Sequence, residues 1–499
     1  MHEYFLTGGE IIDGTGAPPF AATLHIREDR ISRIGQFDAP AGAPVIDCSG
    51  LTIAPGFIDS HTHSDLQVIE GRREKLRQGV SLEIVGNCGF SAYPPAQNPA
   101  ELREFANGIF CGDDHWAWPS AKAYLDAIAQ SRTANVASLV GHGSLRIAVA
   151  GNRQGELPES DLARMEALLE EAFDAGATGF STGLMYAPGS SAPLSELERL
   201  CRVAARKGRI YTSHIRSYSD GLLTAIDEQI DLARRTGCRL QISHLQAVGA
   251  KNWPLHAQAI DRIERAHDAG IDVEFDCYPY IAGSTVLTQL LPQKFLDGGI
   301  HALLARLADP AQRAEIARET SDTIPWRWQD ILISSLDSQA NQAVIGKTLA
   351  AIAEDRDCEP INALLDLLTE EEGKVNMVSF NQSEENLRLS LTHPLSTIIS
   401  DSFFVKGRPH PRLHGTFPLL LGTMCRERRW LSLPEAIQKI TSRPALRYGL
   451  ADRGVLREGA FADITVFDST SVDSPANYEN PELPPVGIRE VFLNGMRVQ

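Results

Sequence analysis

RIYTSH at residues 209–214 and LQISH at residues 240–244 decide the fold of this chain. Each is a short apolar run that ends in a histidine, and a helix is predicted between them over 222–236. The same alternation extends to both sides, with helices predicted over 159–175, 195–207 and 256–269 and a strand over 271–276. Strands that alternate with helices in this way are expected to lie parallel in one sheet.

A polar side chain ends one predicted strand after another, and this favours an α/β fold of the (β/α)8 TIM-barrel type. In such a barrel the chemistry lies at the carboxyl ends of the strands. An open, doubly wound sheet is the alternative. The chain has no glycine-rich phosphate-binding fingerprint after its first predicted strand, which counts against that alternative.

The two ends of the chain differ from the middle. Residues 1–53 and 451–499 contain short strand-like runs separated by glycine-rich turns, so we expect them to form one small β-sandwich domain together. Residues 54–450 are predicted to form a metal-dependent catalytic barrel. The alternation of predicted strands and helices stops around 285–345, and we interpret this region as an insertion or a lid over the site.

Composition and charge exclude several classes of function. The net charge of −17 argues against nucleic acid or an anionic membrane as the main partner. No stretch approaches the roughly 20 apolar residues of a membrane span, and the first ten residues do not resemble a signal peptide. The eight cysteines form no paired CxxC framework. We therefore expect reduced thiols and a cytoplasmic location, and the oligomeric state stays open.

A His-x-His pair follows an apolar run near the start of the predicted barrel. His61 and His63 lie in IAPGFIDSHTHSD, residues 53–65. On a strand, residues i and i+2 point to the same face, so both imidazoles converge on one point. This arrangement suits a divalent metal, although the pair alone is a weak signal.

Three further residues strengthen the metal interpretation. Cys88 lies between glycines in IVGNCGF, and His214 and His244 end the two strand-like runs quoted above. A thiolate is a strong zinc ligand, and neighbouring barrel strands would bring the two histidines together. The alternatives are a buried free cysteine and two structural histidines.

An acid and a fifth histidine complete the candidates for catalysis. Asp401 follows the apolar run 395–400; there a carboxylate would take a proton from metal-bound water, whose pKa falls to about 7, and pass it to the leaving amine. A helix N-cap or loop aspartate is the alternative. His142 ends another strand-like run and is expected to polarise a carbonyl or to line the pocket, with a structural role equally open. Cations in segment 408–418 would meet a substrate carboxylate, unless this segment is a solvated loop.

The chain resembles the amidohydrolase superfamily and, within it, the N-acyl-D-amino-acid deacylases, also called D-aminoacylases. The matching motifs run in order over nearly the whole chain: APGFIDSHTHSD, IVGNCGFS, LVGHGSLR, GATGFSTGLMYAPG, TSHIRS, ISHLQAVG, DCYPYIAGST, ISD and HPRLHGTFP. This resemblance implies a (β/α)8 barrel with a flanking β-sandwich, and a zinc enzyme.

The resemblance also implies roles for individual residues. A tightly bound zinc would be held by Cys88, His214 and His244. A second metal position, weak or vacant, would be formed by His61, His63 and Asp401. Asp401 would be the general base, and no carboxylated lysine is expected. Tyr278 and Ser284 match positions that line the family's substrate site.

Two positions depart from the family pattern. Gln246 stands where relatives usually carry a lysine that helps to bind the substrate carboxylate, and Tyr218 stands where many carry a carboxylate. A neutral glutamine forms no ion pair. Either Arg216, Lys251, Arg408 or another cation compensates, or the substrate lacks a free carboxylate at this place.

The predicted function is therefore zinc-dependent hydrolysis of the amide bond of an N-acyl-D-amino acid or a closely related small N-acyl compound. Metal-bound hydroxide would attack the amide, with Asp401 as base and then acid. One alternative is an amidohydrolase that acts on a cyclic amide, as dihydroorotases and hydantoinases do, or on a β-linked dipeptide. The other is an inactive scaffold that binds zinc without turnover.

Overall fold

The computed structural model describes residues 2–112 and 115–499, and its centre is an eight-stranded parallel sheet. Every neighbouring pair in this sheet is parallel. In sheet order its strands are β18 (Ser396–Ile398), β14 (Val273–Cys277), β13 (Arg239–Ile242), β12 (Ile210–His214), β11 (Gly179–Gly183), β10 (Asn135–Gly141), β9 (Val80–Val85) and β8 (Phe57–Asp59).

The sheet closes on itself just beyond its two outer strands. The backbone N–H of Asp401 donates to the carbonyl of His61 at 2.8 Å, and that of His63 donates to the carbonyl of Ser402 at 2.9 Å. These bonds join the chain after β18 to the chain after β8. The predicted (β/α)8 barrel is confirmed, and the open sheet is wrong because the two edges meet.

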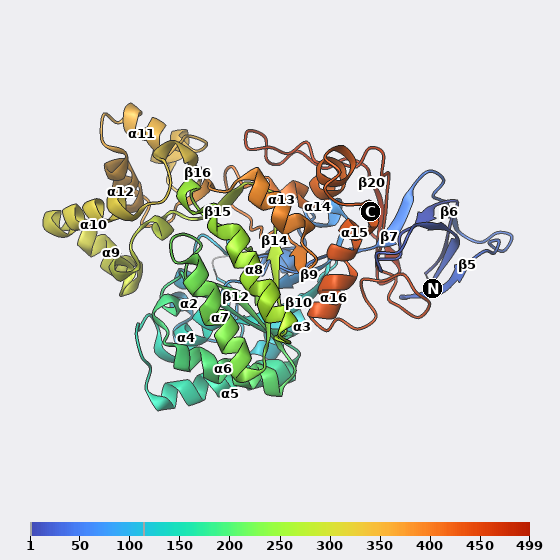
Figure 1. Ribbon diagram of the computed structural model, residues 1–499, viewed down its shortest axis with the longest axis horizontal. Helices are drawn as coiled ribbons and strands as arrows, with labels where there is room; N and C mark the ends of the chain where they lie inside the picture. Colours follow the sequence, from blue (N-terminus) through green and yellow to red (C-terminus); the bar gives the residue numbers. More distant parts are fainter. Residues whose placement is uncertain (1, 113–114) are drawn as a thin grey trace.

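Helices cover the outside of the barrel (Figure 1). The four predicted helices appear as α5 (Glu159–Ala175), α6 (Leu194–Arg206), α7 (Leu222–Thr236) and α8 (Leu255–Asp268). Helix α5 buries one apolar face, including Met165 and Leu169, against the barrel, and it ends at Gly176 with φ 116°. Among the described residues, no helix combines the length and the apolar character that crossing a membrane requires.

The two chain ends build separate sheets beside the barrel. One sheet has the order β5 (Arg30–Gly35), β4 (Thr23–Arg27), β1 (Glu3–Thr7) and β6 (Val45–Asp47). The other has the order β21 (Met496–Arg497), β20 (Ile488–Leu493), β19 (Ile464–Phe467), β7 (Thr52–Pro55), β2 (Glu10–Ile11) and β3 (Phe20–Ala21).

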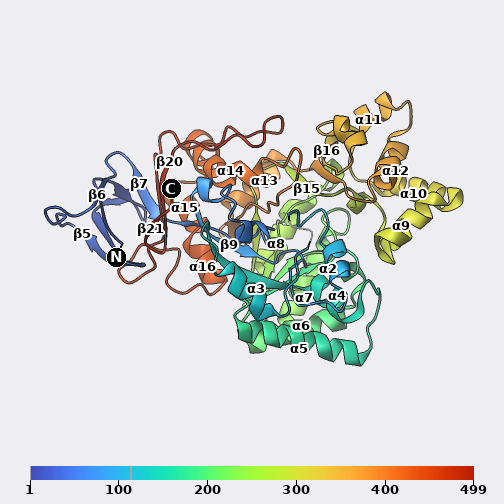
Figure 2. The ribbon, with the colours of Figure 1, turned by 180° about the vertical axis from the view of Figure 1, so that it is seen from behind.

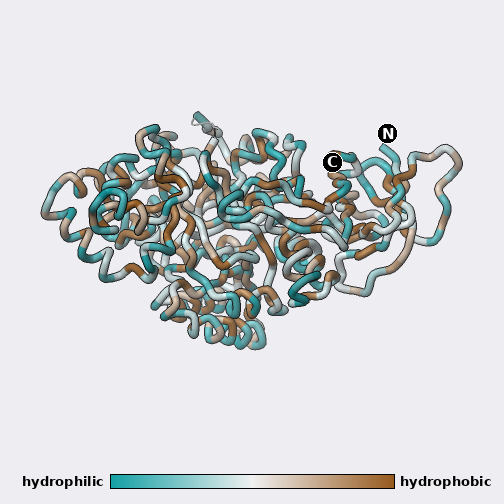
Figure 3. Tube along the Cα trace, turned by 90° about the horizontal axis from the view of Figure 1, so that it is seen from above, coloured by the Kyte–Doolittle hydropathy of each residue, from teal (hydrophilic) through white to brown (hydrophobic). Residues whose placement is uncertain are grey.

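A single apolar core lies between these sheets and combines Leu24 and Ile53 with Ile464 and Phe492. Both termini lie at this end of the molecule (Figure 3). The predicted β module from both chain ends is confirmed as a fold, and we retain its boundaries at 53 and 451 as a proposal.

The irregular region predicted at 285–345 is part of a longer insertion between β14 and helix α13 (Glu384–Thr392). It projects from the barrel on the side away from the terminal sheets (Figures 1 and 2). Its elements are β15 (Ala282–Val286), α9 (Gly299–Ala308), α10 (Pro310–Thr323), β16 (Ile331–Ser335), α11 (Leu349–Asp355), α12 (Pro360–Glu370) and β17 (Asn376–Phe380).

The insertion has an apolar core of its own, which includes Leu303, Ile333 and Leu364. The predicted insertion is too short, because the sequences of α11 and α12 resemble further helices of the alternating barrel pattern. Its role as a lid stays a prediction.

Candidate metal centre

Five predicted site residues lie at the carboxyl ends of barrel strands. His61 follows β8, Cys88 follows β9, His214 is the last residue of β12, His244 follows β13 and Asp401 follows β18. All five are buried. Because parallel strands end at the same rim of the barrel, side chains far apart in sequence meet there.

Four donors of three chemical types converge at this rim. Ligand atoms of His61, Cys88, His244 and Asp401 all lie within 4.8 Å of one another. The Sγ atom of Cys88 is 3.2 Å from Nε2 of His61 and 3.4 Å from Nε2 of His244. Two imidazoles, a thiol and a carboxylate match the preference of zinc for nitrogen and sulfur donors. The residues present therefore fit a zinc ion.

Two further histidines border this cluster. Both ring nitrogens of His214 are buried without a hydrogen-bond partner among the described residues, and its ring centroid is 4.6 Å from that of His244. Nε2 of His63 lies 3.3 Å from Oδ1 of Asp401. A buried imidazole without a partner is costly, so the orphaned nitrogens of His214 are an independent sign of a metal ligand.

The backbone is unusual at three of these positions. Cys88, His244 and Asp401 have φ angles of 51°, 34° and 50°, in the left-handed region that non-glycine residues seldom adopt. Each angle turns the chain sharply as it leaves its strand and places the side chain at the rim. Strain of this kind persists at functional sites where the surrounding structure holds it in place.

Asp276, at the end of β14, orients two of the cluster residues. Its Oδ1 accepts a hydrogen bond from the backbone N–H of His244 at 2.6 Å and lies 3.5 Å from Nδ1 of His61. A carboxylate on the second nitrogen of a ligand histidine fixes the ring orientation. Sequence analysis did not single out Asp276, although its strand, residues 271–276, was predicted.

Arg412 is the most important residue that the sequence did not single out. It lies on helix α14 (Arg412–Leu419), and its Nη1 donates to Oδ2 of Asp401 at 2.8 Å. Burial raises the pKa of the Asp401 carboxyl, but the attraction of Arg412 and of the neighbouring histidines is stronger and holds it well below its usual range. The signal was its place in segment 408–418, whose cations were expected to meet a substrate carboxylate.

A cavity of about 270 Å³ opens over the cluster. Its lining includes His63, Cys88, His214, His244 and Asp401, and three of the predicted substrate residues, Gln246, Tyr278 and Ser284. The opposite wall comes from the insertion.

The three predicted substrate residues lie close to Arg412. The phenol of Tyr278 donates to Oε1 of Gln246 at 3.2 Å. The guanidinium carbon of Arg412 lies 4.9 Å from the centroid of the Tyr278 ring. Nη2 of Arg412 donates to the carbonyl of Ser284 at 3.2 Å. Tyr278 thus contacts both the cation of Arg412 and the neutral Gln246.

The comparisons with known proteins agree with this geometry. The model of the amidohydrolase family matches residues 44–499. The chain belongs to the amidohydrolase family. The family resemblance predicted from the motifs is confirmed, and so is the class of enzyme, a hydrolase of amide carbon–nitrogen bonds.

Two of the similar proteins are deacylases that match this amidohydrolase over nearly its whole length. N-acyl-D-glutamate deacylase of Alcaligenes xylosoxydans xylosoxydans is 35% identical over 499 residues, covering 99% of this chain and 93% of that protein. D-aminoacylase of the same organism is 34% identical over 501 residues, covering 99% and 94%.

A solved structure of N-acyl-D-glutamate deacylase from Bordetella bronchiseptica is 35% identical, with a TM-score of 0.85. The match covers 100% of this chain and 96% of that one. That relative is complexed with zinc and with a phosphonate that mimics the tetrahedral intermediate of its reaction.

Two predicted substrate residues of the amidohydrolase lie outside the lining of the cavity. His142 is the first residue of helix α4 (His142–Ala150), and its Nε2 forms a hydrogen bond with Glu196 at 2.7 Å. Arg216 binds Glu228 through Nε and two backbone carbonyls through its Nη atoms. Both side chains are committed to other partners, so their positions do not support the predicted contact with substrate.

Two other cations suggested in place of the missing lysine do not line the cavity of the amidohydrolase either. Lys251 is 60% exposed and binds Asp220 at 2.9 Å. Arg408 lines a separate surface pocket. Tyr218, the second departure, does line the cavity, and its phenol donates to the carbonyl of Ser243 at 2.9 Å. Arg412 was not named among these cations, but it contacts the cavity residues Asp401, Ser284 and Tyr278.

Proposed function

We propose that this amidohydrolase is zinc-dependent and releases the acyl group from an N-acyl-D-amino acid. The observation that carries the proposal is the convergence of four metal donors next to a cavity that contains Gln246 and Tyr278, with Arg412 beside them. The names of the relatives support the substrate class, since they include an N-acyl-D-glutamate deacylase and a D-aminoacylase. Because these relatives are almost equally identical to this chain, the identities do not indicate which amino-acid side chain the substrate carries.

We assign the tightly held zinc to Cys88, His214 and His244, and a second position, weak or vacant, to His61, His63 and Asp401. When bound, zinc supplies a Lewis acid for a carbonyl oxygen and lowers the pKa of water to about 7. Burial without the metal raises the pKa of the Cys88 thiol to about 11. A coordinated thiol is deprotonated, so zinc loading is expected to release a proton.

Asp401 is the residue that moves the proton. Its Oδ2 is held by Arg412, whereas its Oδ1 faces the histidines of the cluster at 3.3 Å. A carboxylate fixed by one oxygen keeps the other in a defined position. Oδ1 thus accepts the proton of the attacking water and delivers it to the departing nitrogen. Delivery of the proton leaves the carboxylate ionised, and the ion pair with Arg412 favours this form.

We assign recognition of the substrate carboxylate to Tyr278 and Gln246, which line the cavity, with the positive charge of Arg412 next to the Tyr278 ring. Gln246 contributes a neutral hydrogen bond in place of an ion pair. The guanidinium of Arg412 is buried and bound to Asp401 and to the carbonyl of Ser284, so it attracts a carboxylate through its charge, with its carbon 4.9 Å from the centroid of the Tyr278 ring.

The test is release of free amine by the purified, zinc-loaded protein. Substrates are matched N-acetyl-D- and N-acetyl-L-amino acids, their carboxamides and a set of cyclic imides. We expect turnover of free-acid D substrates and at least tenfold lower kcat/KM for the carboxamides. Ring opening of the imides without turnover of any free-acid D substrate would instead identify a cyclic amidohydrolase. Tight zinc binding without turnover would identify an inactive scaffold.

A further inference from the structure

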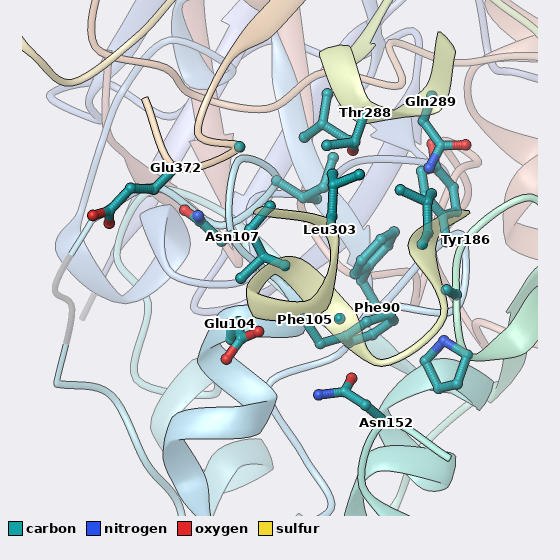
Figure 4. Close-up of a pocket in the computed structure, with 18 of the residues that line it drawn as sticks. Phe90, Glu104, Phe105, Asn107, Asn152, Tyr186, Thr288, Gln289, Leu303 and Glu372 are labelled. Carbon is teal, nitrogen blue, oxygen red and sulfur yellow. The ribbon is translucent and has the colours of Figure 1, made fainter. Parts of the chain in front are cut away.

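A second cavity, of about 130 Å³, lies between the barrel and the insertion (Figure 4). Two aromatic rings form one of its walls: Phe90 and Phe105 stack with their centroids 4.6 Å apart. Leu296, Ile300 and Leu303, from the insertion, also line it. The cavity is therefore largely apolar on two sides.

The second cavity adjoins the metal cavity. Ile109, Tyr186 and Gln289 line both. Strand β15 passes from one to the other, because Ser284 and Thr285 line the metal cavity and Val286 lines the second. The two cavities are therefore neighbours that meet at Tyr186 and Gln289.

The position of the second cavity identifies the part of the substrate that enters it. Gln246 and Tyr278, which lie beside Arg412, follow β13 and β14, on one side of the barrel rim. Phe90 and Tyr186 follow β9 and β11, towards the other side, and Phe90 is two residues from Cys88. If the carboxylate of the amino acid lies near Arg412 and the amide carbonyl lies at the cluster, the acyl chain extends towards Phe90.

We propose that the second cavity is an acyl subsite that selects an apolar acyl chain longer than acetyl. This inference rests on the proposed function and adds a substrate class to it. An acetyl group ends at the metal cluster, whereas a longer chain extends towards the wall formed by Phe90, Phe105 and Leu303. Burial of each additional methylene group is favourable by a factor of about four.

Charge restricts the far end of the acyl chain. Two carboxylates, those of Glu104 and Glu372, line the second cavity, and the described lining contains no lysine or arginine. Figure 4 shows both acids at the edge of the pocket. A chain that ends in a carboxylate would meet two like charges and no cation, so dicarboxylic acyl groups are excluded.

The test compares acyl groups on one D-amino acid that the enzyme accepts. Zinc-loaded, full-length protein is assayed with its N-acetyl, N-hexanoyl and N-adipoyl derivatives. We expect kcat/KM for hexanoyl to exceed that for acetyl by tenfold or more, and the adipoyl derivative, of equal length, to show no gain over acetyl. Ile300→Trp and Asn152→Trp fill the cavity from opposite walls, and each should reduce the hexanoyl-to-acetyl ratio to about two or less.

His301→Trp is the matched control. His301 is exposed and neighbours Ile300 on α9, so the same change there should leave the ratio as in the wild type. A wild-type ratio near one would overturn the acyl subsite while leaving the deacylase proposal intact, and so would a ratio that persists in both filled variants. Failure to cleave any N-acyl-D-amino acid would overturn the proposed function itself.

Discussion

Arg412 and Asp401 form a buried ion pair at the metal centre, with Nη1 of the guanidinium 2.8 Å from Oδ2 of the carboxylate. The Arg412 side chain is 1% exposed and that of Asp401 11%. Arg412 also donates to the carbonyl of Ser284, which ties the pair to the insertion. Asp401 and the cation that orients it are therefore held together as one unit.

Replacing Arg412 by methionine removes one half of this pair. Loss of one partner of a buried ion pair leaves an uncompensated charge and costs about 3 kcal/mol or more of the free energy of unfolding. We expect Arg412→Met to show this loss in denaturant titrations, together with a decrease of at least 100-fold in kcat/KM for a free-acid substrate.

The double variant Arg412→Met with Asp401→Asn is the control for this prediction. The double variant has neither charge of the pair. Its free energy of unfolding should therefore be higher than that of Arg412→Met, while amide hydrolysis stays absent. Equal stability of Arg412→Met and the wild type would show that the pair is not needed to hold Asp401.

Cys88 is predicted to be essential for zinc binding. Serine in its place loses the thiolate, so Cys88→Ser should weaken zinc binding by more than 100-fold, measured by competition with a chelator. Cys425→Ser is a suitable control, because Cys425 is also buried but lies in the helical segment Leu420–Glu427, away from the cluster. Full zinc occupancy in the Cys88 variant would contradict the assigned ligands.

Gln246→Lys is expected to improve recognition of the substrate carboxylate. The new cation would lie near Tyr278, to which Gln246 is now hydrogen bonded. We expect KM for a free-acid D substrate to decrease about tenfold, with kcat nearly unchanged and no decrease for the matching carboxamide. An unchanged preference between acid and carboxamide would indicate that the carboxylate binds elsewhere.

Glu83 makes stability depend on pH. Burial, opposed by the attraction of Lys75, raises the pKa of its carboxyl from 4.5 to about 7. The folded protein therefore binds more protons than the unfolded chain between these values, and the stability falls as the pH rises through this range. The loss in the free energy of unfolding caused by ionised Glu83 is absent below pH 4.5 and complete above pH 7, where it amounts to roughly 3 kcal/mol.

The Glu83→Gln variant removes this titration. It should be more stable than the wild type at pH 8, with an advantage that shrinks towards pH 5, as measured by denaturant titration of both proteins at each pH. The comparison cancels any loss of zinc at low pH that both share. An advantage that does not change with pH would show that Glu83 titrates normally.

Local sequence patterns were sufficient to predict the main helices and strands of the barrel. Helices α5 and α7 have the predicted bounds, since the spacing of apolar residues depends on neighbours three and four positions away. The histidines that end β12 and follow β13 were also predicted, because a parallel barrel brings every carboxyl strand end to one rim. For the same reason the sequence was enough to indicate a metal site.

The sequence by itself determined the barrel and the β module and predicted candidate metal donors, but only the tertiary structure decided which other side chains reach that cluster. Helix α4 begins directly at His142 and turns its ring towards Glu196, whereas α14 directs Arg412 back to Asp401. The physical reason is that periodicity records which face of an element is buried. The partner of a polar side chain depends on how separate elements pack, and no local pattern encodes that.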